Sequence, residues 1–179
     1  MTDRSCGSCY ACCVWLGIDE LNKFFGQSCK HLDGRNGPEK RCGIYETRPK
    51  ACSRYKCGYI DGMNIDRPDE TGFIITAYTA QLEKSGAATV SIIVFDKGKA
   101  GTFQLGRLNV AISQLIGIGI NDIRVVYPDE KRVIHVFDGE IYGGTLFKQT
   151  TPENLAFQTH HPRLAKYELR DLIVESSPT

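Results

Sequence analysis

Short runs of β-branched and aromatic residues alternate with polar segments over the last two thirds of the chain. Five such runs predict strands, because Val, Ile, Thr and aromatic side chains favour extended backbone. They are residues 73–78, 88–95, 101–106, 123–128 and 132–137. Between the third and fourth runs, Leu108, Ile112 and Leu115 recur at helical spacing and predict a helix over residues 107–119. Together with the hairpin turn predicted at "PDEK" (128–131), this order indicates an α+β domain with a mainly antiparallel sheet.

The first third of the chain has a weaker apolar pattern. Ile18, Leu21 and Phe25 suit one face of a short helix within residues 14–25. Gly26 follows and is a suitable helix stop, because glycine readily adopts the conformation that ends a helix. We therefore expect few regular elements in this part, with one short helix among them.

Two polar segments divide the chain further. Residues 33–41 have the composition of a loop, and residues 61–72 lack an apolar period and are typical of a linker. The predicted organisation is a small, metal-stapled, cysteine-rich module over residues 1–62, followed by an α+β domain of unknown role over residues 63–179. The tail over residues 162–175 suits a helix or a strand equally well.

All eight cysteines of the 179-residue chain lie within its first 57 residues. No apolar stretch reaches the roughly 20 residues needed to cross a bilayer, and the N-terminus lacks the apolar core of a secretory signal. These features predict a cytoplasmic protein with no membrane partner. Because cytoplasmic thiols are kept reduced, the cysteines suit a metal site better than a disulfide framework.

The spacing of the first cysteines is typical of metal ligation. Thiolates two residues apart let one turn of backbone direct two sulfurs at one ion, and Cys6, Cys9 and Cys12 form two such steps. Adjacent Cys12 and Cys13 cannot easily face one ion, so we infer that they serve different metals, or that one bridges or lies outside the ligand set. Eight cysteines suffice for two four-thiolate sites. The predicted metal ligands are Cys6, Cys9, Cys12, Cys13, Cys29, Cys42, Cys52 and Cys57.

The order of these cysteines and their neighbours resembles the CxxCxxCC family, the YkgJ-type cysteine cluster. The matching pattern runs from Cys6-x2-Cys9-x2-Cys12-Cys13 through Cys29 with His31-Leu32, Cys42-Gly-Ile-Tyr45 and Arg48-Pro49 to Cys52 and Cys57. The resemblance covers about the first third of the chain. It implies a domain that chelates zinc or iron, and it leaves the biological task open.

Spacing alone leaves the metal open between zinc and iron. Cys6, Cys9 and Cys12 resemble the first three ligands of a bacterial ferredoxin run, but the fourth cysteine followed by proline is missing. Zinc needs only four thiolates in tetrahedral geometry, and eight cysteines divide evenly into two such sites. We therefore expect zinc, with iron or an iron–sulfur cluster as the alternative.

Charge is spread unevenly, although the whole chain carries only +1. Residues 1–57 hold 10 Lys and Arg against 6 Asp and Glu, whereas residues 58–179 hold 12 against 15. Cations near a thiol lower its pKa and support metal binding, so we interpret the basic excess as compensation for the cysteine cluster. The alternative is a nucleic-acid surface on which Tyr45 and Tyr55 stack on bases, which the near-neutral total charge disfavours.

A few other residues have chemical potential. Arg48 precedes a proline that should turn the chain toward the cysteines, where its guanidinium could donate to carbonyls or sulfurs, or stay exposed. We expect His31 to lie outside the ligand set because eight cysteines are available. His135, between two apolar residues of a predicted strand, is interpreted as a structural histidine, and His160-His161 as part of a loop.

Three classes of function fit these features. The first is a metal-binding module joined to a domain that recognises a protein or small-molecule partner. The second is an iron–sulfur protein with redox or methyl-transfer activity, and the third is a nucleic-acid-binding zinc module. No P-loop, dinucleotide fingerprint, nucleophile elbow or zincin helix occurs in the sequence, so no catalytic residue is assigned. The sequence does not decide whether the protein is an enzyme, and we favour a non-catalytic metal-binding role.

Overall fold

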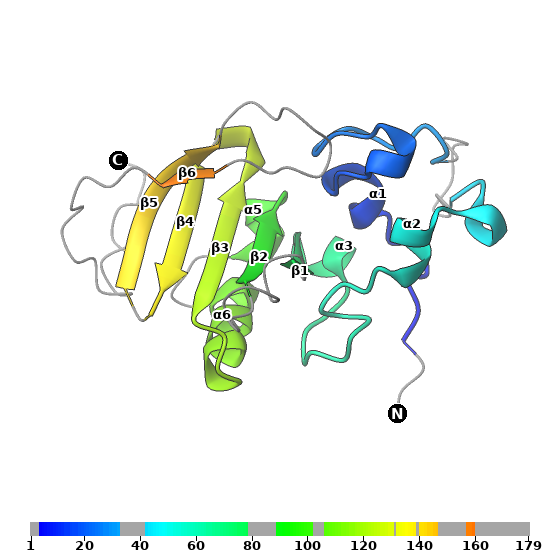
Figure 1. The fold of residues 1–179 in the computed structure, drawn as a ribbon. Coiled ribbons are helices and arrows are strands. Elements are labelled where there is room, and N and C mark those ends of the chain that lie inside the picture. The colour runs from blue at the N-terminus through cyan, green and yellow to red at the C-terminus, as the bar shows by residue number, and fades with distance from the viewer. Residues whose placement is uncertain are drawn as a thin grey trace.

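A computed structural model describes residues 4–32, 42–78, 89–101, 106–130, 132–138, 140–146 and 157–159. Its main feature is a six-stranded sheet in the order β1-β2-β3-β4-β5-β6. The strands are β1 (Phe73–Tyr78), β2 (Thr89–Val94), β3 (Asp122–Tyr127), β4 (Arg132–Phe137), β5 (Glu140–Leu146) and β6 (Phe157–Thr159). Among these strands β2 and β3 run parallel, and every other neighbouring pair is antiparallel (Figure 1). The predicted α+β fold with a mainly antiparallel sheet is therefore confirmed.

The described helices are short apart from α6. They are α1 (Ala11–Trp15), α2 (Lys50–Arg54), α3 (Pro68–Thr71), α5 (Lys97–Ala100) and α6 (Arg107–Gly117), with 3-10 turns η1 (Asp19–Leu21), η2 (Tyr45–Thr47) and η4 (Pro128–Glu130). α5 and α6 lie in the crossover that parallel strands β2 and β3 require. η4 turns the chain between β3 and β4, where a hairpin was predicted. Within the described residues no helix has the length and apolar character to span a bilayer.

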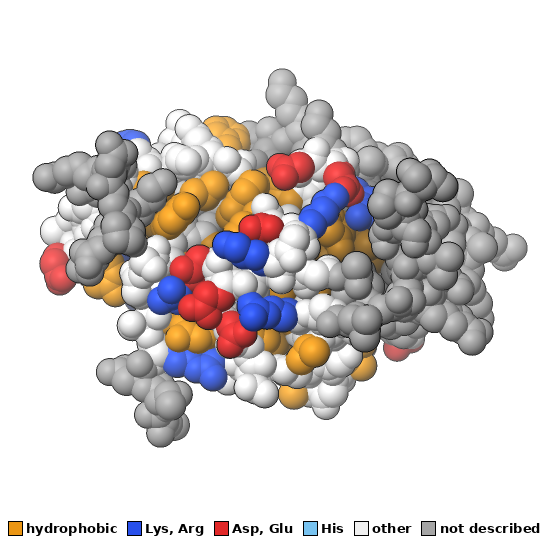
Figure 2. All heavy atoms as spheres, turned by 180° about the vertical axis from the view of Figure 1, so that it is seen from behind, with side chains coloured by type: hydrophobic (Ala, Val, Ile, Leu, Met, Phe, Trp, Pro, Cys, Tyr) orange, Lys and Arg blue, Asp and Glu red, His pale blue; other side chains and the backbone are white. Residues whose placement is uncertain are grey.

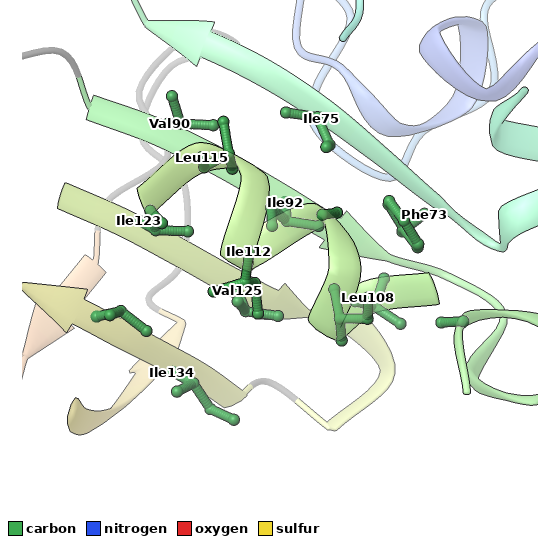
Figure 3. Packing of buried hydrophobic residues seen from close by; sticks show 14 of the residues in the cluster. Phe73, Ile75, Val90, Ile92, Leu108, Ile112, Leu115, Ile123, Val125 and Ile134 are labelled. Carbon is green, nitrogen blue, oxygen red and sulfur yellow. The ribbon is translucent and has the colours of Figure 1, made fainter. Parts of the chain in front are cut away.

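Helix α6 covers one face of the sheet. Leu108, Ile112 and Leu115 recur every three or four residues along α6 and are buried against the central strands. Figure 3 shows these side chains meeting Ile92 and Ile123 in one cluster. Full burial of one such side chain contributes about 1.5–3 kcal/mol, so this face is a substantial hydrophobic core. The helix predicted here is confirmed and ends at Gly117.

The cysteine-rich region packs against the opposite face of the sheet. The contact is made by a second hydrophobic cluster, in which one residue from each of the strands β1 to β4 meets residues of the N-terminal region. The buried members of this cluster are Ala11, Cys57, Ile74, Ile93, Val126 and Val133. Trp15 stacks on Phe95, with ring centroids 5.7 Å apart and planes 10° apart. Figure 1 shows α1 and α2 beside the β1 end of the sheet, away from β5. The strands near β1 are therefore covered on both faces.

The helix predicted within residues 14–25 is wrong. α1 ends at Trp15, and Ile18 is instead extended. Its backbone N–H donates to Lys23 O at 2.8 Å, and Lys23 N–H donates back to Ile18 O at 3.0 Å. Asn22 has φ 48° and closes the loop between them. This loop turns Lys23 inward, and its tertiary contacts outweigh a weak helical pattern.

Four predicted strands agree with β1 to β4 to within one residue at each end. β5 and β6 were not predicted, and β5 contains Gly143 and Gly144, which have low strand propensity. The strand predicted over residues 101–106 cannot be compared, because residues 102–105 lie outside the described residues. The tail over residues 162–175 lies outside them as well.

The segment between the cysteines and the sheet has more structure than its composition indicated. Residues 61–72 include α3, and both Met63 and Ile65 pack against the core beneath α6. The boundary near residue 62 stays a prediction. The loop predicted over residues 33–41 lies outside the described residues.

Candidate metal centre

All eight cysteines gather in one part of the molecule. Seven of them line a single cavity of about 710 Å³: Cys6, Cys9, Cys12, Cys13, Cys29, Cys42 and Cys52. The eighth, Cys57, is buried in the hydrophobic cluster that joins this region to the sheet. All eight are described and carry free thiols. The fold thus brings the eight predicted ligands into one neighbourhood.

A tight turn places the first two cysteines. Cys9 N–H donates to Cys6 O at 2.8 Å, and Gly7 between them has φ 51°, a conformation that favours glycine. The guanidinium of Arg67 lies against this turn, because a Cβ added at Gly7 would be only 2.7 Å from Arg67 Nη1. Arg67 is held there by Asp69, with 2.7 Å between Nε and Oδ1. The positive φ favours glycine here, and the absence of a side chain at Gly7 lets the Arg67 guanidinium approach the cysteine turn.

Backbone contacts bring two distant cysteines to the end of α1. Cys29 N–H donates to Cys13 O at 2.8 Å. Leu32 and Cys42 form an isolated antiparallel bridge. These three cysteines are therefore brought together by main-chain hydrogen bonds.

Cys52 reaches the same neighbourhood from helix α2. Pro49 precedes this helix and has a φ of −53°, which suits a helix start. The Glu20 side chain accepts a hydrogen bond from Ala51 N–H at 3.0 Å. This contact ties the start of α2 to η1, and Cys52 lies in the first turn of α2.

Arg48 lies just before α2 in the chain, and its side chain lines the cavity. Its guanidinium carbon lies 3.9 Å from the centre of the Tyr45 ring, a cation–π contact. Its positive charge favours the thiolate forms of Cys6 and Cys13. Burial nevertheless raises the pKa of Cys6, and the pKa of Cys13 is lowered mainly by its hydrogen bond with Cys12. The sequence left open whether Arg48 turns toward the cysteines or stays exposed, and its place in the cavity lining agrees with the first interpretation.

The adjacent cysteines of α1 interact directly. The Cys12 thiol donates a hydrogen bond to the Cys13 sulfur, which raises the pKa of Cys12 and lowers the pKa of Cys13. Lys23 lowers the pKa of Cys13 further. Burial raises the pKa of Cys6, and it raises the pKa of Cys9 to about 11. Because their pKa values are raised, Cys6, Cys9 and Cys12 keep their protons at neutral pH until a metal ion replaces them.

Lys23 is a functional candidate that was not recognised in the sequence. It is only 3% exposed, and its ammonium group donates to the carbonyls of Val14, at 3.0 Å, and Leu16. Burial lowers the pKa of Lys23, whereas the neighbouring thiols of Cys29 and Cys13 raise it. A buried lysine needs negative charge nearby, and thiolates can supply that charge here. Its only sequence signal is a lysine next to Phe24 and Phe25 in an amphipathic run.

The donor set fits a thiophilic metal in type and number. Among the described residues, no three His, Cys, Asp or Glu side chains lie close enough together to hold an ion. The cavity of about 710 Å³ is far larger than the ~30 Å³ occupied by one water molecule in the liquid, so there is room for the sulfurs to move. Zinc and iron–sulfur clusters both prefer thiolate ligands. Metal binding would have to draw the sulfurs closer together.

The histidines have other surroundings. His31 is half-buried beside the cysteines but does not line the cavity. His135 Nε2 lies 2.8 Å from Asp122 Oδ1, in agreement with the interpretation of a structural histidine. The pair predicted to lie in a loop at residues 160–161 is outside the described part of the chain.

The two tyrosines considered for base stacking lie in different environments. Tyr55 packs in the cluster between the cysteine region and the sheet, whereas Tyr45 is exposed and contacts Arg48. Figure 2 shows Lys and Arg interspersed with Asp and Glu on the face seen there. Several of these charges are paired, as in Arg67 with Asp69. These observations do not favour a nucleic-acid surface.

Comparisons with protein-family models, with curated proteins and with solved structures found no match. The resemblance to the CxxCxxCC family therefore rests on the motif alone. Function is accordingly inferred from the geometry and chemistry of the cysteine region.

Proposed function

We propose that the protein binds zinc through its eight cysteines, as a member of the CxxCxxCC type. The observation that carries this proposal is the gathering of seven cysteines around one cavity, with Cys57 close enough to Cys6 and Cys9 to influence the pKa of both. Such a concentration of thiols in a reducing compartment is typical of metal ligation. Inert buried cysteines would have no reason to collect at one cavity.

The metal has a structural role in this proposal. The described helices of the cysteine region, α1 and α2, have five residues each. Isolated helices shorter than about 12–15 residues are marginal in water, and small modules usually need a metal or disulfides. Thiolate ligation would tie α1, α2 and the segments around Cys29 and Cys42 to one another.

The positive charges support an anionic cluster. Two Zn²⁺ ions with eight thiolates carry a formal charge of roughly −4. Lys23, Arg48 and Arg67 supply positive charge beside the cysteines. Lys23 in particular is buried, and the cost of burying its ammonium group falls when anionic thiolates surround it.

Elemental analysis of protein purified without a metal-affinity column tests this proposal. We expect about two equivalents of zinc per chain, since each structural zinc takes four thiolates. Less than about half an equivalent of any transition metal would refute metal binding. A brown protein containing acid-labile sulfide would instead assign an iron–sulfur cluster and make redox or methyl-transfer chemistry the leading hypothesis.

A further inference from the structure

We propose that the eight cysteines form two separate four-thiolate sites, each for one tetrahedral divalent ion such as Zn²⁺. The sheet-side site consists of Cys6, Cys9, Cys12 and Cys57, and the outer site consists of Cys13, Cys29, Cys42 and Cys52. This inference rests on the proposed function and adds which cysteines share an ion.

The sheet-side site is defined by packing against the sheet. Cys9, Cys12 and Cys57 all belong to the hydrophobic cluster that includes Ile74 of β1. Cys6 joins them through the turn in which Cys9 N–H donates to Cys6 O at 2.8 Å. Four cysteines from two distant segments therefore lie on the sheet side of the region.

The outer site is defined by main-chain contacts. Cys29 N–H donates to Cys13 O at 2.8 Å, and Leu32 pairs with Cys42. Cys52 joins this set from α2. Cys52 lines the cavity beside Cys13, Cys29 and Cys42. Unlike Cys9, Cys12 and Cys57, these four cysteines do not pack in the cluster against the sheet.

The adjacent cysteines fall on different sides because α1 is helical. Consecutive residues of an α-helix point about 100° apart, since 3.6 residues complete one turn. Cys12 points toward the sheet and joins that cluster, whereas Cys13 pairs through its carbonyl with Cys29. Because Cys12 and Cys13 are consecutive residues of α1, the two sites lie next to each other. Two adjacent cysteines that could not share one tetrahedral ion can therefore each serve a different one.

Two of the three cations beside the cysteines lie at different sites, and the third, Arg48, lines the cavity that the sites share. Arg67 lies against the Cys6–Cys9 turn, and its Nη2 lies 3.4 Å from Ser8 Oγ. Lys23 lies at the C-terminal end of α1, where its ammonium group donates to the carbonyls of Val14 and Leu16. Each four-thiolate zinc site carries a formal charge of roughly −2, so each has a cation of its own.

Partial metal removal from the wild-type protein tests the division without any substitution. Zinc-loaded protein is titrated with a chelator until about one equivalent has left, and exposed thiols are then alkylated and located by fragmentation mass spectrometry. The expected result is alkylation of four cysteines as a set, matching either the sheet-side site or the outer site. Alkylation of a set that mixes the two sites would overturn the proposal.

Double substitutions give a second, independent measurement. Cys9→Ser with Cys57→Ser removes two ligands of one site and should leave about one zinc ion by native mass spectrometry. Cys52→Ser with Cys57→Ser removes one ligand from each site and should leave none. Equal zinc content in the two double variants would contradict the division.

Failure of this inference is distinguishable from failure of the proposed function. If the wild-type protein holds no zinc, the proposed function is wrong. If the wild-type protein holds two zinc ions and the alkylated sets are mixed, only the assignment of ligands to sites is wrong.

Discussion

The two faces of the sheet hold their partners in different ways. Among the described residues, the face toward α6 forms a cluster of fifteen buried hydrophobic residues, including Ile92, Ile112 and Ile123. The face toward the cysteine region has a cluster of six, and much of what packs there is only half-buried. Since stabilisation scales with the apolar area removed from water, the α6 face contributes much more than the cysteine face.

This difference indicates which parts of the molecule can fold on apolar burial alone. The sheet and α6 form regular elements around an aliphatic core, as an independent α+β unit does. The cysteine region has five-residue helices and buries the charged Lys23. We therefore infer that the sheet relies on its core, and the cysteine region relies on bonds to metal.

Metal removal should have the largest effect of the changes considered. It should affect the cysteine region and leave the sheet and α6 folded. Structural zinc contributes about 10–16 kcal/mol in small zinc modules, so chelation should unfold the cysteine region. Hydrogen exchange should show loss of protection in α1 and α2, whereas β2 and β3 keep theirs. Trp15 is the single tryptophan and stacks on Phe95, so its fluorescence should report the detachment. Unchanged protection in α1 and α2 after complete chelation would show that the metal is not structural.

Two neighbouring residues of β2 provide a sharper test. Ile92 and Ile93 are 0% and 1% exposed and face opposite sides of the sheet, toward α6 and the cysteine region respectively. Ile92→Ala should lower the free energy of unfolding of the sheet by about 2–5 kcal/mol, with or without metal, because it leaves a cavity in the core.

Ile93→Ala is the matched variant on the other face. In the metal-loaded protein it should cost a similar free energy, since Ile93 contacts the cysteine region there. After chelation it should cost much less, because the region that covered Ile93 has detached. Denaturant unfolding of both variants, each with and without chelator, measures these four values. An equal cost of Ile93→Ala in the two conditions would contradict the detachment.

Most of the sheet could be predicted because its strands are continuous runs of β-branched residues. β2 and β4, for example, contain "SIIV" and "RVIHV", and burial against α6 or the cysteine region agrees with their local propensity. β5 was missed because Gly143 and Gly144 weaken its pattern, and only pairing with β4 makes it a strand. The helix predicted around Ile18 is wrong because the backbone of Ile18 instead forms hydrogen bonds with Lys23. This loop depends on tertiary packing, which the local pattern does not show.

The candidate site was predicted in its chemistry but not in its arrangement. Spacing identified eight cysteines as ligands, because two-residue gaps are a local property of the chain. The proximity of Cys29 to Cys13, and of Cys57 to the sheet, depends on contacts between distant segments. Lys23 was missed because a polar residue within an amphipathic run normally faces solvent. Burial of such a residue becomes visible only once the loop that turns it inward is known.

The smallest effect is expected from Lys23, and it tests whether the buried charge of the cysteine region serves the metal. Lys23→Met keeps most of the side-chain volume but removes the charge beside Cys13 and Cys29. It also removes the hydrogen bonds to the carbonyls of Val14 and Leu16. Loss of such an outer partner typically weakens metal affinity about 10–100-fold, so we expect a decrease of that size in competition with a chelator. Lys30→Met, at an exposed position one residue after Cys29, is the matched control and should leave the affinity unchanged. If both variants kept the wild-type affinity while the circular dichroism of the sheet was intact, the charge of Lys23 would have no part in metal binding, and the cysteine region would bury it for packing alone.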